Sequence, residues 1–392
     1  MKEVYIVSMA RTPIGSFNGS LKGLTAVQLG EKVINGVVER GSIKHTDVDE
    51  VIMGNVLQAN NGQAPARQAA LNAGIPETVP CTTINKVCAS GMKAIMMGAQ
   101  SILAGDNDVV IAGGMESMSN APYYLANGRN GYRFGNGNII DGIVRDGLQD
   151  PYKGGMMGNV AEICAKGCDF SREDQDAYAE QSYKRAHAAY ENGWFNDELL
   201  SVEIPQRKGD PVVVKDDDEY KKIIWEKIRT VRPAFEKDGT VTAVNASKIN
   251  DGAAAVLLMS KEKMEALGVT PIAKILGYAD AAQEPDWFTT TPAKAIPKAL
   301  SKASVDAANV DFYEINEAFA VVALANNKEL KLDDSKVNVF GGGVSLGHPI
   351  GASGARIICT LMSVLKHKDG KIGASGICNG GGGASAMVIE RC

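Results

Sequence analysis

Two cysteines and one histidine of this chain stand in sequence contexts that can make a side chain reactive. Cys88 follows a polar stretch and comes directly before small residues and an apolar helical pattern, so its sulfur should lie at a helix N-terminus. The free N–H groups and the dipole of a helix favour a thiolate at that place. A cysteine is more often a small buried hydrophobic residue, and the local sequence alone gives both interpretations equal weight.

His348 lies between a glycine and a proline, inside the glycine-rich segment 341–351. A histidine followed by proline does not fit the interior of a helix or a central strand, so a tight turn must hold the imidazole. The plainer interpretation is a loop histidine bonded to the backbone. Its turn setting among so many glycines favours a catalytic role.

Cys378 ends an apolar run and comes shortly before the four glycines Gly380–Gly383. The backbone N–H groups of such glycines can point into a shared cavity and hold an oxyanion. Gly381, Gly383 and Ala386 fit a dinucleotide-binding spacing. No βαβ unit follows them in this sequence, so a dinucleotide site is not expected.

A fourth segment, Glu314–Phe319, places acids and the amide of Asn316 between a strand and a helix, which an ordinary helix cap would also explain. Together with Cys88, His348 and Cys378, it predicts acyl transfer through a thioester. A cysteine thiolate attacks an acyl carbonyl, an imidazole takes its proton, and backbone N–H groups hold the oxyanion. A second cysteine can move a proton to or from carbon.

Length and composition bound the rest of the prediction. The chain has 392 residues, 41 Lys and Arg against 46 Asp and Glu, a net charge of −5 and 45% apolar residues, which describes a globular protein of about two to three domains. The mild acidity argues against nucleic acid as a partner. No run of about 18 uncharged apolar residues occurs, so no membrane span is expected. The 7 cysteines are too few for a disulfide scaffold and indicate a reducing compartment.

Strand-like and helix-like segments alternate in residues 1–118 and again in 251–392, which predicts βαβ units and a sheet covered by helices. The pattern breaks in residues 119–250, which hold Gly/Asn/Tyr-rich loops and an Ala-rich helix. A Ser-Gly pair opens a helix at Ser90 and again at Ser353, and an apolar strand with glycines follows each helix. This repeat predicts two related domains with an insertion over their junction.

Four of these motifs together resemble those of the thiolase family. They are VCASG around Cys88, NEAF from Asn316, GHPIG around His348 and CNGGG from Cys378. ARTPIG near the start and NASKINDGAA at 245–254 extend the likeness over nearly the whole chain. The resemblance implies an α/β fold of two similar βαβαβαββ domains in a five-layered α/β/α/β/α core. The N-terminal half would be 1–118, an inserted loop domain for coenzyme A binding and tetramerisation 119–250, and the C-terminal half 251–392.

The resemblance also implies a role for each motif residue. Cys88 would be the nucleophile that accepts an acyl group, and His348 would activate it. Cys378 would remove a proton from the methyl group of a second acyl-CoA, or return it in thiolysis. His348 and a water held by Asn316 would stabilise the enolate oxygen, while the N–H groups of Cys88 and Gly380 form the other oxyanion hole. The implied reaction joins two acetyl-CoA into acetoacetyl-CoA and CoA, through an acetyl-Cys88 intermediate.

Coenzyme A is anionic, and Lys and Arg residues crowd the segment 221–232 of this acidic chain. A solvated charged surface would be the usual explanation, but the resemblance assigns part of the cluster to coenzyme A. The implied contacts with its adenine, phosphates and pantetheine come from Lys222, Lys227, Ser247, Met157, Phe235, Ala318 and Phe319. Coenzyme A is therefore expected as substrate and product, with no covalently bound cofactor.

Within the family, the closest likeness is to the potassium-dependent mitochondrial acetoacetyl-CoA thiolases. The positions of their potassium site match Tyr183, Ala243, Val244, Ala246 and Val344. The alanine and neighbouring contacts would use backbone carbonyls, which suit a hard monovalent ion and leave almost no sequence signature. The resemblance therefore implies a K⁺ site.

One departure bears on the substrate. Met156 stands where acetoacetyl-CoA thiolases usually carry a histidine, whereas Phe288 matches a residue associated with 2-methylacetoacetyl-CoA. The alternative enzyme is therefore a longer-chain 3-ketoacyl-CoA thiolase of fatty-acid β-oxidation. A ketoacyl synthase would carry a Cys-His-His site, where this chain has Asn316 and a second cysteine. The alternative from another class is a non-catalytic acyl-CoA- or lipid-binding protein on the same scaffold.

Assembly and compartment follow only from the resemblance. The family is usually a homotetramer, built as a dimer of dimers. The compartment would be the cytoplasm for a bacterial chain and the mitochondrial matrix for a processed eukaryotic one.

Overall fold

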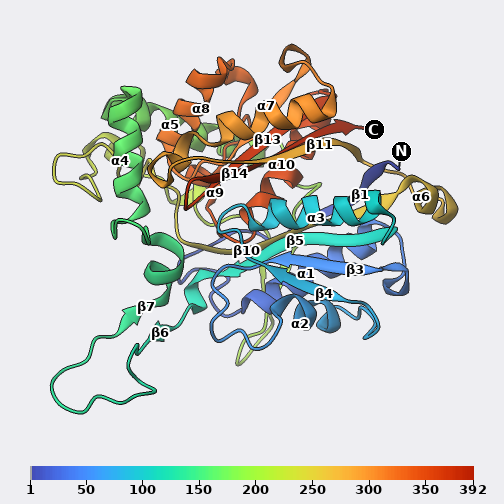
Figure 1. Ribbon diagram of the computed structural model, residues 1–392, viewed down its shortest axis with the longest axis horizontal. Helices are drawn as coiled ribbons and strands as arrows, with labels where there is room; N and C mark the ends of the chain where they lie inside the picture. The colour runs from blue at the N-terminus through green and yellow to red at the C-terminus, as the bar shows by residue number, and fades with distance from the viewer. Residues whose placement is uncertain (1) are drawn as a thin grey trace.

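The computed structural model describes residues 2–392, and its strands fall into two halves of similar construction (Figure 1). The first half has the strand order β4–β3–β5–β10–β1, and the second has the order β12–β13–β14–β11. The strands of the first half are β1 (Val4–Arg11), β3 (Glu50–Gly54), β4 (Cys81–Ile84), β5 (Val109–Ser117) and β10 (Asn250–Ser260). Those of the second half are β11 (Ala273–Ala282), β12 (Phe312–Ile315), β13 (Ile372–Asn379) and β14 (Gly383–Arg391). A short ladder between β1 and β11 joins the halves, and β2 (Gly15–Ser16) pairs with β10.

The two halves repeat one pairing scheme. In each half two neighbouring strands are parallel, β3 with β5 and β12 with β13, and the next two pairs are antiparallel. A single parallel bridge between Tyr313 and Val337 stands where β4 pairs with β3 in the first half. The predicted fold of two similar halves is confirmed by this repeat.

The predicted domain limit at residue 250 is corrected by the position of β10. This strand begins at that limit, yet it is hydrogen-bonded between β1 and β5 and so belongs to the first half. Every residue of β10 is buried, and its partners are more than a hundred residues earlier in the chain. The strand's place in the sheet is therefore set by long-range pairing, which its local sequence does not encode. The insertion spans 118–249.

Helices form three layers around and between the two halves. The core helices are α1 (Ala26–Arg40), α2 (Pro65–Asn72), α3 (Ser90–Ala104), α7 (Pro292–Ala303), α8 (Ala320–Leu330) and α10 (Ser353–His367). α1 and α2 pack on the outer face of the first half, and α1 begins with a capping box of Thr25 and Gln28. α7 covers the outer face of the second half, beside α8. Since α3 and α10 lie between the halves, the predicted α/β/α/β/α order is confirmed (Figure 1).

α3 and α10 begin at the matched Ser-Gly pairs and cross closely. A Cβ atom on Gly91 would lie 2.8 Å from the backbone nitrogen of Ala355, and one on Gly354 would lie 2.3 Å from that of Met92. Only glycine permits these approaches. The stretch Val87–Ala104 is long and apolar enough to cross a membrane, but 56% of it is buried inside the protein, where α3 packs between the two halves.

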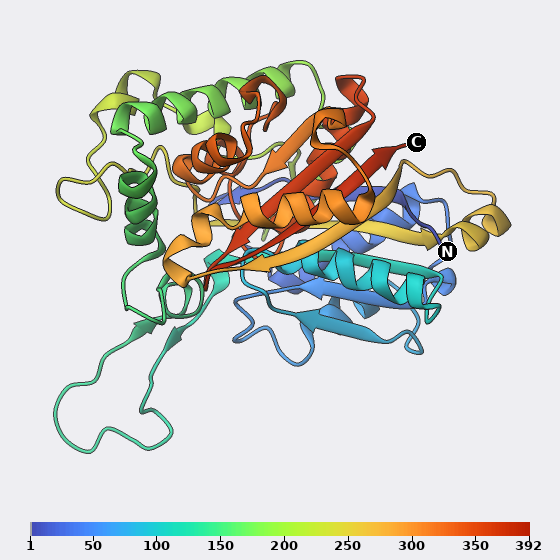
Figure 2. The ribbon, with the colours of Figure 1, turned by 45° about the horizontal axis from the view of Figure 1, so that its top comes forward.

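The insertion lies to one side of this core. It starts with a hairpin of β6 and β7 that protrudes from the body of the molecule (Figure 2). α5 begins at the predicted cap, Ser171, whose hydroxyl accepts a hydrogen bond from the N–H of Asp174. The elements outside the core layers are β6 (Tyr123–Tyr124), β7 (Ile140–Asp141), α4 (Met157–Cys168), α5 (Arg172–Glu191), β8 (Val202–Ile204), β9 (Val212–Val214), α6 (Lys261–Leu267) and the short α9 (Gly343–Leu346).

Candidate active site

Cys88 lies on a sharp turn between β4 and α3. Val87 before it has a left-handed backbone conformation, with φ of 48°, which strains a β-branched residue. The Ser90 hydroxyl holds the turn, because it donates to the carbonyl of Val87 at 2.6 Å and accepts from the N–H of Lys86 at 2.8 Å. The turn therefore presents Cys88 to a cavity that residues of both halves line.

The Cys88 thiol is neutral in the free site. Loss of water around the sulfur raises the pKa of Cys88 to about 12, against the opposing effect of the backbone N–H groups of Gly380 and of Cys88 itself. The lowered pKa expected from the helix terminus is therefore wrong for the free protein, since α3 begins only at Ser90 and its dipole does not offset the lost hydration. Both N–H groups nevertheless lie next to the sulfur, where they can donate to the oxygen of an acyl group bound to it.

His348 is held neutral and in one tautomer. Its Nδ1 lies 2.6 Å from the hydroxyl of Ser353, and this hydroxyl donates its own proton to the carbonyl of Pro349 at 2.9 Å. Ser353 therefore accepts from Nδ1–H, which leaves Nε2 unprotonated, 3.5 Å from the side-chain nitrogen of Asn316. Burial, followed by the charge of Arg356, lowers the pKa of His348 to about 3. The Nε2 lone pair is free to take a proton.

Cys88, His348 and Gly380 line one cavity of about 60 Å³. Apolar side chains, among them those of Phe288 and Phe319, form much of its wall. A space of this size holds a few water molecules or a small organic group. The cavity thus accepts a group of a few heavy atoms at the Cys88 sulfur.

Cys378 and Asn316 lie beside this cavity rather than in its lining. Cys378 is fully buried next to Cys88, and burial followed by the neighbouring sulfur raises the pKa of Cys378 well above its ordinary value. Asn316 is 1% exposed, and its Oδ1 has no hydrogen-bond partner in residues 2–392. An unpartnered buried oxygen can hold a water. Cys378 and Asn316 thus lie close to Cys88, His348 and Gly380. All five residues of the predicted catalytic set come together.

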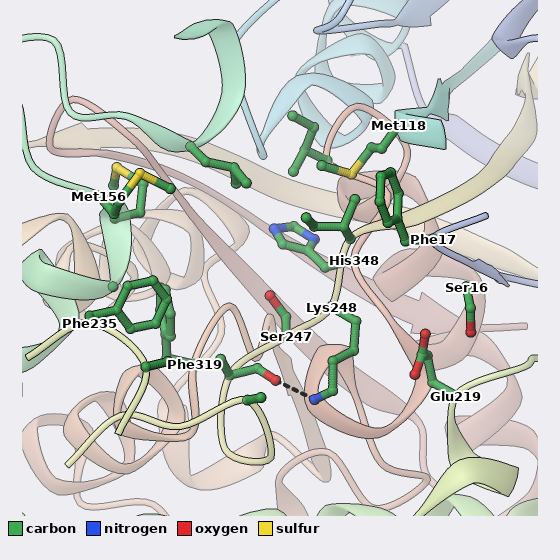
Figure 3. A pocket seen from close by; sticks show the side chains of 18 of the residues that line it. Ser16, Phe17, Met118, Met156, Glu219, Phe235, Ser247, Lys248, Phe319 and His348 are labelled. Atoms are coloured by element: carbon green, nitrogen blue, oxygen red, sulfur yellow. Dashed lines mark hydrogen bonds between the residues drawn. The ribbon is translucent and has the colours of Figure 1, made fainter. Parts of the chain in front are cut away.

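A larger pocket of about 520 Å³ adjoins this cavity, and His348 and Phe319 line both. Figure 3 shows His348 near its middle, with Phe235 and Phe319 on one side and Phe17 on the other. The predicted coenzyme A contacts found in the two linings are Met157, Lys222, Phe235, Ser247, Ala318 and Phe319. Lys227 lies in neither lining, and its side chain is exposed.

Part of the pocket wall was not predicted from the sequence. The residues that form it come from separate segments and share no motif. The additional lining residues include Ser16, Phe17, Met118, Leu148, Glu219, Lys248, Ile249 and Ile350. Met156, noted only as a departure from the family pattern, lines the same pocket. Lys248 and Ile249 stand inside the NASKINDGAA motif, which could have drawn attention to them.

Two buried carboxylates hold the turns around His348. Glu116 accepts from three backbone N–H groups, that of Gly351 at 2.8 Å among them, and burial raises the pKa of Glu116 to about 7. Glu317 accepts from the N–H of Val344 at 3.1 Å and from the hydroxyls of two side chains of α5. Glu317 belongs to the NEAF motif, whereas Glu116, near the end of a strand, has no local sequence signal.

The residues of the predicted potassium site also come together. Tyr183 and Val344 pack in one buried apolar cluster, against which Val244 lies. Ala243 and Ala246 line the larger pocket. Within residues 2–392, no group of three or more His, Cys, Asp or Glu side chains is arranged as metal ligands would be. A cation at this place would therefore depend on backbone carbonyls.

Comparison with known proteins identifies the family. Residues 4–262 match the thiolase N-terminal domain, and residues 269–391 match the thiolase C-terminal domain. The acetyl-CoA acetyltransferase of Schizosaccharomyces pombe is 56% identical over 390 residues, which cover 99% of either chain. The cytosolic acetyl-CoA acetyltransferase of Gibberella zeae is 59% identical over 389 residues, which cover 99% of this chain and 98% of the relative.

Solved structures give the same result. The Acat5 thiolase from Ascaris suum, in complex with coenzyme A, has a TM-score of 0.95 at 48% identity and covers the whole of both chains. The acetyl-CoA acetyltransferase of Bacillus anthracis has a TM-score of 0.97 at 44% identity over 100% of this chain and 99% of its own. This chain belongs to the thiolase family, and it is an acyltransferase. Its full-length similarity is to the acetyl-CoA acetyltransferases.

Proposed function

We propose that this chain is an acetyl-CoA C-acetyltransferase, which joins two acetyl-CoA into acetoacetyl-CoA and CoA and catalyses the reverse thiolysis. The small cavity supports this most strongly, because a thiol, a neutral imidazole and two N–H donors meet in about 60 Å³. An acetyl group fits this space, whose wall includes the ring of Phe288. The names of the full-length relatives agree with a short substrate.

The first half-reaction acetylates Cys88. As the sulfur attacks the acetyl carbonyl, the thiol proton passes to Nε2 of His348, and negative charge develops on the carbonyl oxygen. The N–H groups of Cys88 and Gly380 stabilise this oxyanion. The bond to the CoA sulfur then breaks, and the CoA thiolate takes the proton from His348. Since the pKa of Cys88 is about 12 and that of His348 about 3, no ion pair forms beforehand, and the proton moves as the sulfur attacks.

The second half-reaction forms the carbon–carbon bond. The thiol of Cys378 passes its proton to Nε2 of His348, and the resulting thiolate takes a proton from the methyl group of a second acetyl-CoA. Burial raises the pKa of Cys378, which makes its thiolate a strong base for a carbon-bound proton. His348 and a water on the unpartnered Oδ1 of Asn316 stabilise the enolate oxygen. The carbanion attacks the acetyl carbon, Cys88 leaves as a thiolate and receives the proton from Nε2 of His348, and acetoacetyl-CoA departs, with Cys378 again a thiol.

The larger pocket holds coenzyme A in this proposal, as the Ascaris relative was solved with that molecule. Phe235 and Phe319, whose ring centroids are 6.2 Å apart in an edge arrangement, give pantetheine an apolar wall next to Ser247. Lys222 lies exposed at the pocket edge, hydrogen-bonded to the hydroxyl of Ser16, and offers a cation to a phosphate. Because Lys227 lies outside the pocket, its side chain would contact coenzyme A only at a phosphate group that extends beyond the pocket edge.

The test is CoA-dependent loss of acetoacetyl-CoA, followed by the absorbance of its magnesium enolate. The panel includes 2-methylacetoacetyl-CoA and a longer straight-chain 3-ketoacyl-CoA. Acetoacetyl-CoA should give the highest kcat/KM, with 2-methylacetoacetyl-CoA as a second substrate. Preference for the longer chain would replace this proposal by the β-oxidation thiolase. Loss of none of the three would favour the non-catalytic acyl-CoA-binding protein.

Assembly and compartment complete the proposal. The protruding hairpin exposes apolar side chains, with Phe134 fully exposed and Tyr123 and Ile139 each about two-thirds exposed. Exposed apolar groups of this kind mark an interaction surface, which supports a homotetramer formed through this hairpin. The cytosolic relative supports the cytoplasm as compartment. The mitochondrial matrix stays a prediction for a processed eukaryotic chain.

A further inference from the structure

Lys248 places its ammonium group among the carbonyls that the family resemblance assigns to potassium. Its Nζ donates hydrogen bonds to the carbonyl oxygens of Ala246 at 2.6 Å, Val344 at 3.3 Å and Val244 at 3.4 Å. It also lies 5.8 Å from the centre of the Tyr183 ring. Figure 3 shows the ammonium at the end of a dashed line that marks one of these bonds.

An added K⁺ ion does not fit this arrangement. An ammonium and a potassium ion are both monovalent cations that carbonyl oxygens stabilise, and the three N–H groups of the ammonium match the three acceptors. Two such cations sharing these carbonyls would repel each other strongly in a partly dry site. The buried carboxylates of Glu219 and Glu317 add negative charge near the ammonium. These carboxylates stabilise the positive charge of Lys248 at this place.

We propose that Lys248 is a built-in cation that does in this chain what a bound potassium ion would do, so that the enzyme works without K⁺. The inference rests on the proposed function, since it concerns how the site presents its contacts to coenzyme A. Lys248 is a positioning residue in this scheme, because it acts through the segments that it joins.

The first of these segments is the loop that carries Ser247. Ala246 and Lys248 flank this serine, and the N–H of Ser247 donates to the carbonyl of Ala318 at 3.0 Å. Ser247 lines both the larger pocket and the cavity at Cys88. The bond from Lys248 to the carbonyl of Ala246 therefore fixes the loop at the point where coenzyme A passes.

The second segment is α9, which ends directly before Gly347 and His348. Its Val344 is held from both sides, since the N–H donates to the carboxylate of Glu317 at 3.1 Å and the carbonyl accepts from Lys248 at 3.3 Å. The carboxylate of Glu317 and the ammonium of Lys248 thus both fix the backbone of Val344 in α9. Loss of the ammonium should loosen the coenzyme A loop and the turn before His348 together.

Two substitutions at one position separate charge from packing. Lys248→Ala removes the ammonium and leaves carbonyls facing a space that K⁺ can enter. Lys248→Met fills that space without charge. Lys208→Ala, which removes an exposed lysine that forms no ion pair within residues 2–392, is the matched control. Each protein is compared in K⁺ and in Na⁺ at one ionic strength, by thiolysis kinetics and by unfolding temperature.

We expect the unchanged protein and Lys208→Ala to give the same kinetics and unfolding temperature in both salts. In Na⁺, Lys248→Ala should raise KM for CoA about tenfold, with a smaller effect on kcat, because charged hydrogen bonds to the loop are lost. K⁺ should restore that KM to within about twofold and raise the unfolding temperature of this variant. Lys248→Met should show the raised KM with no response to K⁺.

Several outcomes would overturn the inference. One is activation or stabilisation of the unchanged protein by K⁺, which would make the metal the resident cation. Another is a Lys248→Ala protein with normal KM in Na⁺, or one that is impaired and indifferent to K⁺, as expected for an ordinary structural hydrogen bond. If Lys248→Ala fails to fold, the unchanged protein and Lys248→Met still decide through their K⁺ response. Unfolding temperatures test the inference even if no thiolysis occurs, so its failure is distinct from that of the proposed function.

Discussion

The two halves of the core are built alike but position their reactive groups in different ways. α3 and α10 both begin at a buried serine that a glycine follows. The segment before α3 carries Cys88, and its serine bonds only to backbone, at the strained turn of Val87. The segment before α10 carries His348, and its serine bonds to the imidazole itself. Backbone strain presents the nucleophile, whereas side-chain hydrogen bonds fix the base.

The ends of β5 and β13 also carry side chains with different roles, one structural and one chemical. Near the end of β5, Glu116 is occupied by backbone N–H groups and holds loops in place. Near the end of β13, Cys378 lies buried beside Cys88, and within residues 2–392 its sulfur is hydrogen-bonded only to its own backbone N–H. The first half thus supplies one sulfur and a supporting carboxylate, and the second half supplies imidazole, amide and second sulfur. The two repeated halves bring two helix ends together, and a few side chains divide the chemistry between them.

The largest expected effects come from exchanging one sulfur in each half. Cys88→Ser should lower kcat for thiolysis by about 10⁴-fold, because the nucleophile of both half-reactions is lost. Cys378→Ser should lower the overall rate by a similar factor yet still become acetylated by acetyl-CoA. Mass spectrometry of the intact protein measures the acetyl-enzyme. Equal loss of acetylation in both variants would erase the division of labour between the halves.

The matched serines should give unequal effects of the next size. Ser353→Ala should lower kcat by about tenfold to a hundredfold with little change in KM, because Nδ1 of His348 loses the partner that fixes its tautomer. Ser90→Ala should instead cost about 1–3 kcal/mol of unfolding free energy, because the part-buried N–H of Lys86 loses its acceptor and the carbonyl of Val87 loses its donor. Steady-state kinetics and urea unfolding of each variant separate the two effects. Identical profiles would mean that both serines serve the backbone alone.

The pH dependence of alkylation tests the neutral thiol of the first half. With a pKa of about 12 for Cys88, the thiolate fraction grows with pH, so iodoacetamide should label Cys88 about tenfold faster for each pH unit between about 6 and 9. Acetyl-CoA should protect it. Peptide mapping at each pH identifies the labelled cysteine. A plateau near neutral pH would restore the lowered pKa that the helix terminus suggested.

The catalytic residues could be predicted from the sequence, because each of them stands in a short motif whose backbone conformation depends only on neighbouring residues. The proline after His348 and the glycines after Cys378 dictate turns wherever they occur. The same local logic placed Ser171 as the cap of α5. Fold class followed from the alternation of strands and helices together with the family resemblance.

The features that could not be predicted from the sequence depend on residues that are far apart in the chain. The pKa of Cys88 is set by exclusion of water, to which distant wall residues such as Phe319 contribute. The role of Lys248 rests on acceptors from two segments, one of them at Val344. The placement of β10 needed partners on both sides. Long-range desolvation and pairing leave no local pattern.

The smallest expected effect concerns an ion cluster that ties the halves together. Asp280 of β11 pairs with Lys86 and, at 2.8 Å, with Lys93 of the first half, and it accepts from Ser385 at 2.7 Å. Against the opposing effect of burial, these partners lower the pKa of Asp280 to about 2. A depressed pKa contributes stability above the unfolded value of about 3.9, and this contribution is lost as the pH falls toward 2. Because the Asp280 side chain is 36% exposed, Asp280→Asn should cost no more than about 1 kcal/mol near neutral pH.

Urea unfolding at neutral pH and near pH 3 measures that difference, which should shrink at the lower pH. Glu236→Gln is the matched control, since it removes an exposed pair with Lys166 inside the insertion and should leave stability unchanged at either pH. A control loss as large as that of Asp280→Asn would mean that the halves are joined by the β1–β11 ladder and the α3–α10 crossing alone. A loss of stability confined to Asp280→Asn would show that this ion cluster is a third contact that holds the halves together, next to the turn that presents Cys88.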